Sequence, residues 1–493
     1  MIIAPKAEKR TYVARCLRSH CVPSITVAMR LARSFYRLSY LRTNASHAIL
    51  TPYTTLMKRD FCILGLHSIK TNWLNTYSSG STAIPDSHQI SKSSPNHVKM
   101  ISSSLKQSCP IDPLMKRVRQ LARVPQTGVS LQELFDYGHQ INSNKLILAA
   151  KFLHHELAVR YSHRIRNLED LPHGLNRMPS VQKVREWYLR SIEELLAFPR
   201  VETPEQELQF TALIESIKKR HNGTLFTMAR GVYELKMEWL NTHTTLTSMD
   251  KKFDSADQKQ DPSRSTDFAD LVDIHSFLDA FYMSRIGIRM LMGQHIALHE
   301  EEEGWVGCIC ETTSPAEIAL GAIDTARNMC IRQYGDAPDV EVHGHTDFSM
   351  PYVPSHLHHM LFEVIKNSMR AVVEFHGVDN DMPPIRIIIA DGEDNEDVSI
   401  KISDEGGGIP RSSLPRIWSY LYTTADAKAF ERMEAPDDFG GDSPLAGLGY
   451  GLPISRLFAR YFGGDLQVIS MEGYGTDTYL HLKRVGDASE PLP

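Results

Sequence analysis

Residues 355–374 read SHLHHMLFEVIKNSMRAVVE, and this stretch decides the fold class of the second half of the chain. Its apolar residues recur at three- and four-residue steps, which is typical of an amphipathic helix. They are Leu361, Val364, Ile365, Met369 and Val372. His359, Glu363, Asn367 and Arg370 form a second, polar stripe. At 100° per residue these four lie within about 80° of arc. The stripe is either a solvated face or one wall of a site, since an amide oxygen can ligate Mg²⁺ and a carboxylate can accept a proton.

A glycine-rich segment follows at residues 402–410, ISDEGGGIP. It leaves a predicted strand at Asp404 and enters three glycines. A carboxylate at a strand end can accept a hydrogen bond from an exocyclic amine such as that of adenine, and glycines let a flat ring approach the backbone. Taken alone, the same pattern is also an ordinary turn.

A second glycine-rich segment, AGLGYGLPISRLFARYFGGD, spans residues 446–465. Alternating glycines lead into a predicted helix with Pro453 in its first turn, and the N–H groups of such a loop bind anions. No Lys-Ser/Thr pair follows, so it is not a Walker A loop, and no strand runs directly into it, so it is not a Rossmann loop. Thr476, beyond the next strand, can bring a hydroxyl to the same pocket.

Strands and helices alternate around these motifs. Residues 339–342, 385–390, 398–402, 466–470 and 478–482 are predicted strands, and residues 355–375 and 451–462 are predicted helices. This order indicates an α/β sandwich. Residues 111–299 are helical instead, with predicted helices at 145–168, 180–197, 205–240 and 275–298, a polar loop at 242–266, and the pattern of a four-helix-like bundle.

Composition excludes several classes of protein. The chain has 493 residues, and 54 Lys and Arg against 59 Asp and Glu give a net charge of −5. No basic excess remains for a generic nucleic-acid binder, so no nucleic-acid partner is expected. Seven cysteines in this length are not a disulfide scaffold. No apolar run reaches the roughly 18 residues of a membrane span, so none is expected.

The first sixty residues are basic, Ser-rich and poor in acids. They hold eleven Lys and Arg against only Glu8 and Asp60. This composition is typical of a mitochondrial or plastid transit peptide; the alternatives are a tail without an address or a start codon placed too early. Residues 77–108 are Ser-rich without apolar periodicity, so they are read as a linker.

The order of these motifs resembles the ATPase superfamily of DNA gyrase, bacterial histidine kinases and the MutL repair protein. Within this superfamily, the residues of the motifs resemble those of the mitochondrial pyruvate dehydrogenase kinases. The similarity extends into the helical region, for example FLHHELAVR at 152–160 and SRIGIRMLMGQH at 284–295. It implies an α+β multidomain chain: a transit peptide and disordered linker at 1–108, a helical, four-helix-bundle-like domain at 109–305, an α/β sandwich ATPase domain of the histidine-kinase type at 306–486, and a tail at 487–493.

The resemblance also implies roles for single residues. Glu363 matches the general base, His359 its orienting partner and Asn367 the Mg²⁺ ligand, while Asp404 matches the residue that reads adenine. The implied ATP-binding residues are Glu363, Lys366, Asn367, Arg370, Asp404, Thr423, Thr424, Gly447, Leu448, Gly449, Tyr450, Gly451, Leu452 and Thr476.

A second site is implied in the helical domain, where the family binds pyruvate-like inhibitors. Its residues here are Tyr188, Ser191, Arg220, His221, Arg285 and Arg289. Arginines suit a small carboxylate, but ion pairing on the bundle surface would explain the same residues.

The implied activity is ATP- and Mg-dependent phosphorylation of serines in the decarboxylase component of the pyruvate dehydrogenase complex, in the mitochondrial matrix, which switches the complex off. The lipoyl domain of the acetyltransferase core and a second copy of the chain are the implied partners. The Asp-Trp tail of animal members is absent, because the chain ends GDASEPLP.

Three other functions compete with this one. A branched-chain 2-oxoacid dehydrogenase kinase would share the chemistry on another complex. A phosphohistidine sensor kinase would use His155, which lies in a superficially similar helix but lacks the expected Pro. A scaffold could bind ATP without turnover. Assays with separately purified decarboxylase components distinguish these functions.

Overall fold

The computed structural model describes residues 113–250, 272–392, 397–420, 449–484 and 488–492. Residues 110–493 form one compact unit. The predicted transit peptide and linker, residues 1–108, lie outside the described residues, as do Thr423, Thr424, Gly447 and Leu448.

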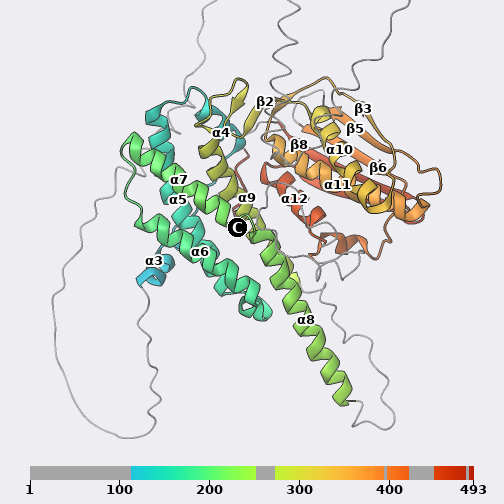
Figure 1. The fold of residues 1–493 in the computed structure, drawn as a ribbon, viewed down its shortest axis with the longest axis horizontal. Helices are drawn as coiled ribbons and strands as arrows, with labels where there is room; N and C mark the ends of the chain where they lie inside the picture. Colours follow the sequence, from blue (N-terminus) through green and yellow to red (C-terminus); the bar gives the residue numbers. More distant parts are fainter. Residues whose placement is uncertain (1–112, 251–271, 393–396, 421–448, 485–487, 493) are drawn as a thin grey trace, which may run out of the picture. The chain divides into compact units, whose positions relative to one another are not determined.

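The first described region is helical (Figure 1). Its elements are α3 Pro113–Leu121, α4 Leu131–Gly138, α5 Ser143–Glu169, the 3₁₀ helix η2 Pro172–Arg177, α6 Pro179–Ala197, α7 Pro204–Arg220, α8 Thr224–Asp250 and α9 Val272–Ala297. Helices α5, α6, α7, α8 and α9 pack around a shared core of fully buried side chains: Leu157, Val184, Ile192, Phe210, Ile214, Met228 and Phe281.

Two details differ from the predicted helix pattern. The run at 205–240 is two helices, since α7 ends at Arg220 and α8 begins at Thr224, with the poor helix former Gly223 between them. The predicted polar loop at 242–266 is wrong over residues 242–250, which continue α8. No Gly or Pro interrupts the chain from Val232 to Asp250, so the polar residues there do not end the helix.

The second region is built on a mixed five-stranded sheet in the order β3-β5-β6-β8-β7. The strands are β3 Val340–Gly344, β5 Ile385–Asp391, β6 Asp397–Asp404, β7 Asp465–Met471 and β8 Gly475–Lys483, and they confirm the five predicted strands. β3 and β5 run parallel, and every other neighbouring pair is antiparallel. Val398, Ile400 and Ile402 are all buried, as their alternation predicts.

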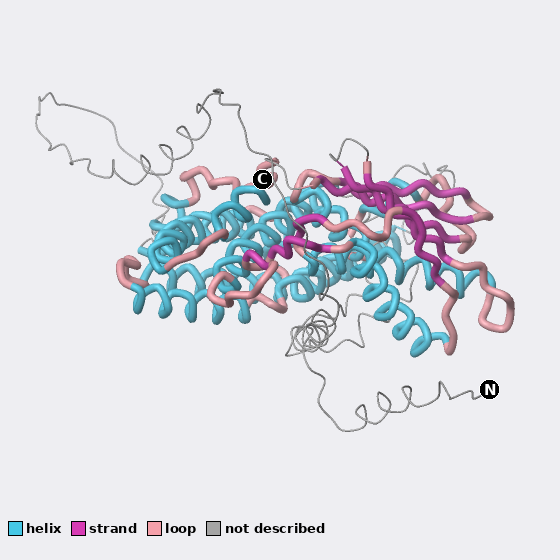
Figure 2. Tube along the Cα trace, turned by 90° about the horizontal axis from the view of Figure 1, so that it is seen from above, coloured by secondary structure: helices cyan, strands magenta, loops and turns pink. Residues whose placement is uncertain are grey.

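Helices cover one side of this sheet, which Figure 2 shows as a layer of strands beside a layer of helices. They are α10 Pro315–Tyr334, α11 Pro354–His376 and α12 Gly451–Tyr461. α11 packs on α10, α12 and β6, while α12 packs on β7. Helix α10 was not predicted, nor was the small sheet of β1 Trp305–Val306, β2 Ile309–Thr313 and β4 Met350–Tyr352. A 3₁₀ helix, η5 Leu414–Trp418, follows β6.

The two regions contact each other directly. Helix α9 packs on α12. Near the C-terminus, the buried Glu490 accepts hydrogen bonds from Arg160 of α5 and from Tyr461 of α12. The predicted tail at 487–493 is therefore packed in its described part, and a domain boundary at residue 305 stays a prediction.

Candidate functional site

Glu363 is the buried centre of the polar stripe on α11. Only 2% of the residue is exposed, whereas the stripe as a solvated face would leave it in water. Its Oε2 accepts a hydrogen bond from the Lys366 ammonium at 2.7 Å. Its Oε1 is buried without a hydrogen-bond partner among the described residues. A buried carboxylate with one committed oxygen and one open oxygen is suited to accept a proton.

The glycine-rich segment at 446–465 reaches this carboxylate. α12 begins at Gly451, and a Cβ added there would lie 2.2 Å from Oε2 of Glu363. No side chain larger than hydrogen fits at this position without displacing the carboxylate. Two motifs that are 88 residues apart in sequence therefore meet at one atom.

His359 lies one helical turn before Glu363. Its ring packs on Phe458 of α12, with 5.0 Å between ring centroids, and its Nε2 is buried without a partner among the described residues. Burial lowers the pKa of His359, although the charge of Glu363 acts in the opposite direction. The ring is therefore neutral at neutral pH. No hydrogen bond joins it to Glu363 in the described part of the chain, so its orienting role stays a prediction.

The other two residues of the stripe lie in different environments. Asn367 is exposed, so its amide is available to an ion or ligand in solution. Arg370 donates from Nε to Glu374 at 2.7 Å, and Tyr334 of α10 donates to the same carboxylate. Arg370 is thus held at the edge of α11 next to α10.

Asp404 ends strand β6 and is 7% exposed. Its Oδ2 accepts from the Ser368 hydroxyl of α11 at 2.8 Å, and its Oδ1 accepts from the backbone N–H of Gly406 at 3.1 Å. Burial raises the pKa of Asp404, and the bond from Ser368 partly offsets this rise. Ser368 was not among the predicted site residues, although it directly follows Asn367 in α11.

Close packing of glycines fixes this corner of the sheet. A Cβ on Gly406 would lie within 2.8 Å of the α11 backbone, and a Cβ on Gly475 would lie 2.0 Å from the Asp404 carbonyl oxygen. Thr476 is the β8 partner of Asp404 in the ladder. Ser368 and Glu363 are five residues apart, about 7.5 Å along α11. A ligand that reads Asp404 and reaches Glu363 must therefore be extended.

The six predicted inhibitor-pocket residues come together at the end of α7. The Ser191 hydroxyl lies 2.9 Å from His221 Nε2 and accepts from Arg220 at 2.8 Å. The Tyr188 ring stands edge-on to His221, with 4.5 Å between centroids. From α9, Arg285 donates to the His221 carbonyl at 3.2 Å, and Arg289 donates to the Asn222 side chain at 3.0 Å.

Positive charge is concentrated in this cluster. Burial and the neighbouring arginines lower the pKa of His221 to about 3. Burial and the charge of Arg285 lower the pKa of Arg289 to about 9. Arg220 pairs with Glu194, but within the described residues neither Arg285 nor Arg289 forms an ion pair with a carboxylate. Ion pairing therefore does not explain these two arginines, and a small anion would supply the missing charge.

Comparison with known proteins gives the family. A family model described as mitochondrial branched-chain alpha-ketoacid dehydrogenase kinase matches residues 128–310, and one described as histidine kinase-, DNA gyrase B- and HSP90-like ATPase matches residues 352–486. A mitochondrial pyruvate dehydrogenase (acetyl-transferring) kinase of Arabidopsis thaliana is 47% identical over 398 residues, covering 79% of this chain and 100% of that protein. The protein of that name from Schizosaccharomyces pombe is 39% identical, and the match covers 77% of this chain and 98% of that protein. The mitochondrial pyruvate dehydrogenase (acetyl-transferring) kinase isozyme 1 of Mus musculus is 36% identical, and the match covers 76% of this chain and 81% of that protein.

The chain belongs to the mitochondrial pyruvate dehydrogenase (acetyl-transferring) kinase family. The predicted family, the predicted fold class and the predicted enzyme class, a protein kinase, are confirmed. The kinase binds ATP through its second region, which matches the ATPase model. Within the described residues, no helix of the kinase is both long and apolar enough to span a membrane.

Helix α9 contacts residues on either side of 421–448, a segment that lies outside the described part of the chain. Tyr420 precedes this segment and donates its hydroxyl to Asp279 of α9 at 2.5 Å. Tyr450 follows it and packs on Tyr282 of α9 and on Tyr420, with ring centroids 6.1 and 5.1 Å apart. Helix α9 thus carries two of the pocket arginines and also contacts Tyr420 and Tyr450.

Proposed function

We propose that this kinase transfers the γ-phosphoryl group of ATP to serines of the decarboxylase component of the pyruvate dehydrogenase complex and thereby inactivates the complex. The observation that carries the proposal is Glu363, a buried carboxylate with one open oxygen, which lies against Gly451 at the start of α12. The names of the relatives support the choice of complex.

In the proposed mechanism, Oε1 of Glu363 takes the proton of the substrate serine while the serine oxygen attacks the γ-phosphorus. Lys366 holds the other oxygen of the carboxylate, so the open oxygen faces the reaction. ADP leaves with the electrons of the broken bond. Positioning and neutralisation of charge supply most of the catalysis in such reactions, and the base adds a smaller factor.

The remaining nucleotide contacts follow from the same arrangement. Asp404 has lone pairs left after bonding Ser368 and Gly406, and these would accept from the exocyclic amine of adenine. The amide oxygen of the exposed Asn367 would hold Mg²⁺, which when bound neutralises phosphate charge. Lys366, Arg370, Thr476 and the segment from Gly447 to Leu452 would line the phosphates and ribose, with Thr423 and Thr424 at the start of the cover.

The inhibitor pocket is proposed as the regulatory site. A carboxylate such as that of pyruvate would bind Arg285 and Arg289, which have no carboxylate partner among the described residues. Charge-assisted hydrogen bonds would hold it. The high positive charge around the neutral His221 makes a small anion the best complement.

We also propose import into the mitochondrial matrix, binding to the lipoyl domain of the acetyltransferase core, and a homodimer. The basic, acid-poor first sixty residues support import. A fluorescent fusion of residues 1–108 that stays in the cytosol would contradict it. Sedimentation of the kinase mixed with the lipoyl domain tests the proposed binding.

A second candidate is phosphorylation of the branched-chain 2-oxoacid dehydrogenase complex, because the family model over residues 128–310 carries that description. The deciding experiment gives the full-length kinase labelled ATP and either purified decarboxylase component. Serine labelling and inactivation of the pyruvate enzyme alone are expected. Labelling of the branched-chain enzyme alone would select the second candidate, and no labelling with retained ATP binding would indicate a scaffold.

A further inference from the structure

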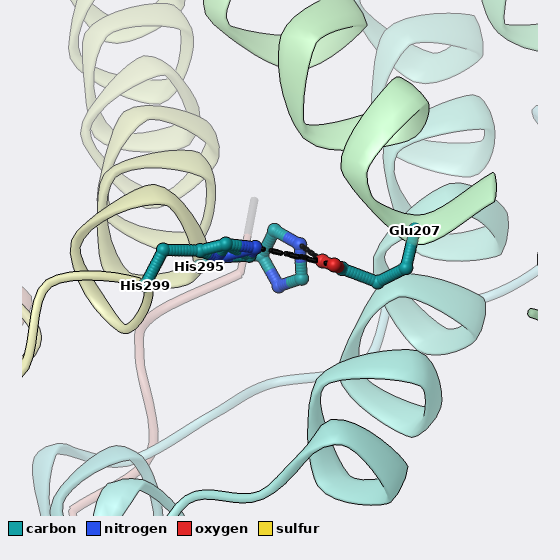
Figure 3. A group of neighbouring side chains, drawn as sticks. All are labelled: Glu207, His295 and His299. Carbon is teal, nitrogen blue, oxygen red and sulfur yellow. Dashed lines mark hydrogen bonds and ion pairs between the residues drawn. The ribbon is translucent and has the colours of Figure 1, made fainter. Parts of the chain in front are cut away.

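Three side chains of types that can ligate a metal, two of them buried and one partly exposed, lie together in the helical region, away from both sites described above. Glu207 stands in the first turn of α7, His295 in the last turn of α9, and His299 just after α9 ends. Figure 3 shows both imidazole rings directed at the Glu207 carboxylate. Each Nε2 lies 3.0 Å from Oε1 of Glu207, and the three ligand atoms all lie within 4.8 Å of one another.

The three side chains and Thr211 form one compact polar cluster. Oε1 of Glu207 lies 3.0 Å from Nε2 of His295, from Nε2 of His299 and from the hydroxyl of Thr211. Nε2 of His299 also lies 3.2 Å from Oε2 of Glu207. The Nδ1 atoms of both histidines are buried without a partner among the described residues, so no hydrogen bond at Nδ1 fixes the tautomer of either ring. Both Nε2 lone pairs can therefore face a cation placed between the rings and the carboxylate.

We propose that Glu207, His295 and His299 form a binding site for a divalent transition metal, with Zn²⁺ the best match. Two imidazoles and one carboxylate are a common zinc ligand set that leaves a fourth position for water. A tetrahedron with bonds of about 2.0–2.1 Å holds its ligand atoms about 3.3 Å apart. Each Nε2–Oε1 distance has to open by only about 0.3 Å to reach this geometry.

The surroundings suit such a site. The side chains of Glu207 and His295 are 4% and 3% exposed, whereas that of His299 is 18% exposed and gives an ion a route from solvent. Thr211 donates to the carboxylate and would orient it. The site joins the start of α7 to the end of α9. The same two helices carry the pocket residues, with Arg220 at the other end of α7 and with Arg285 and Arg289 earlier in α9.

Zinc binding by the full-length kinase tests the site directly. Protein is stripped with a chelator, dialysed against ZnCl₂ in limiting amounts and measured by elemental analysis. Glu207→Gln keeps the shape of the side chain and removes its charge, and His299→Ala changes a partly exposed residue. Glu205→Gln and His155→Ala are matched controls, because both alter exposed groups of the same helical region. Circular dichroism checks that every variant is folded.

One tightly bound zinc per chain is expected for the wild type and both controls. Affinity should fall at least about 100-fold in Glu207→Gln and in His299→Ala, the upper end of the loss caused by removing an outer partner of a metal ligand. Thr211→Val should weaken binding about 10- to 100-fold. Co²⁺ in place of Zn²⁺ should give the intense visible absorption of tetrahedral cobalt. Absence of a stoichiometric zinc in the wild type would overturn the proposal, and so would its retention in both folded ligand variants.

Discussion

At the scale of the residue, the open oxygen of Glu363 makes the sharpest prediction. Glu363→Gln preserves volume but removes the ability to take a proton. Phosphoryl transfer should fall about 100-fold or more, the usual cost of losing a general base, while ATP binding largely survives. Single-turnover kinetics and calorimetric ATP titration measure the two effects. Glu341→Gln, on an exposed strand position, is the control. Turnover near the wild-type rate would remove Glu363 from this role.

Arg285 makes the second residue-scale prediction. A charge-assisted hydrogen bond to a bound carboxylate contributes roughly 1.5–3 kcal/mol. Arg285→Ala should therefore weaken inhibition by pyruvate or a halogenated acetate roughly 10- to 150-fold, with little change in ATP affinity. Inhibition curves at several ATP concentrations measure this. Arg166→Ala, on an exposed face of α5, is the control. Unchanged inhibition, or strict competition with ATP, would place the inhibitor elsewhere.

His221 predicts a pH dependence of stability. Its pKa is lowered from 6.5 to about 3 by burial and by Arg285, Arg220 and Arg289, so protonation favours the unfolded chain. The contribution of the neutral ring to the free energy of unfolding is complete above pH 6.5 and is lost as the pH falls toward 3. This one group should cost about 2 kcal/mol of unfolding free energy between pH 6.5 and 4.5.

Urea denaturation of wild type and His221→Gln at pH 6.5, 5.5 and 4.5 measures this contribution. The variant should lose less stability on acidification by the stated amount. His155→Gln, in which an exposed histidine is changed, should follow the wild type. Parallel curves for His221→Gln and wild type would show that the His221 ring is protonated in the folded kinase.

At the scale of the element, the contact between α11 and the start of α12 determines the geometry of the base. Gly451→Ala puts a methyl group 2.2 Å from the present position of Oε2 of Glu363, so the carboxylate or the helix must move. The catalytic rate should fall at least about 10-fold, because misplacement of a reacting group by about 1 Å can cost more than that.

Steady-state kinetics and circular dichroism of Gly451→Ala measure the effect. Gly321→Ala is the matched control, since it changes a helical glycine of α10 whose added Cβ meets only one atom, at 4.0 Å. Normal turnover in a folded Gly451→Ala protein would mean that the carboxylate position tolerates displacement.

Helix α10 shows where periodicity fails to predict an element. Its buried face consists largely of Ala316, Ala319, Ala322 and Ala326. Alanine is only weakly hydrophobic, and the larger apolar residues Leu320 and Ile331 of the same helix are exposed, so the three- and four-residue repeat is weak in the sequence. In α11 the same face holds Leu, Ile, Val and Met, and its bounds were predicted to within two residues. The small alanine side chains let α10 approach α11 closely, and the same small side chains make the apolar repeat of α10 hard to recognise in the sequence.

At the scale of the whole molecule, Glu490 connects the two regions. It is buried between Arg160 of the helical region and Tyr461 of the ATPase region. Among the described residues, Glu490→Ala leaves the buried guanidinium with only one carboxylate, that of Glu156, and with the Thr127 carbonyl. Loss of one partner of a buried pair costs about 3–5 kcal/mol. The unfolding midpoint in urea should fall accordingly. Glu472→Ala, on an exposed turn, is the control. A stability equal to that of wild type would show that the tail is dispensable for holding the regions together.

Local sequence patterns were enough to identify the family and the order of a helical region before an α/β region, and they predict the residues of the nucleotide site. These depend on local periodicity and on glycines whose backbone role is readable without neighbours. The spacing of His295 and His299, four residues apart on a helix, was also readable, but Glu207 is 88 residues away from His295 and nothing local connects them.

Which polar groups are buried, and which groups they contact, is known from the tertiary structure and not from the linear pattern. In the folded chain, Glu363 is buried with one open oxygen, and Ser368 donates a hydrogen bond to Asp404. Arg285 and Arg289 have no carboxylate partner among the described residues, and Arg160 donates to Glu490. The physical reason is that burial, charge pairing and unsatisfied hydrogen bonds depend on contacts between residues far apart in the chain. A linear pattern specifies a face of a helix, but not the side chain that packs against it.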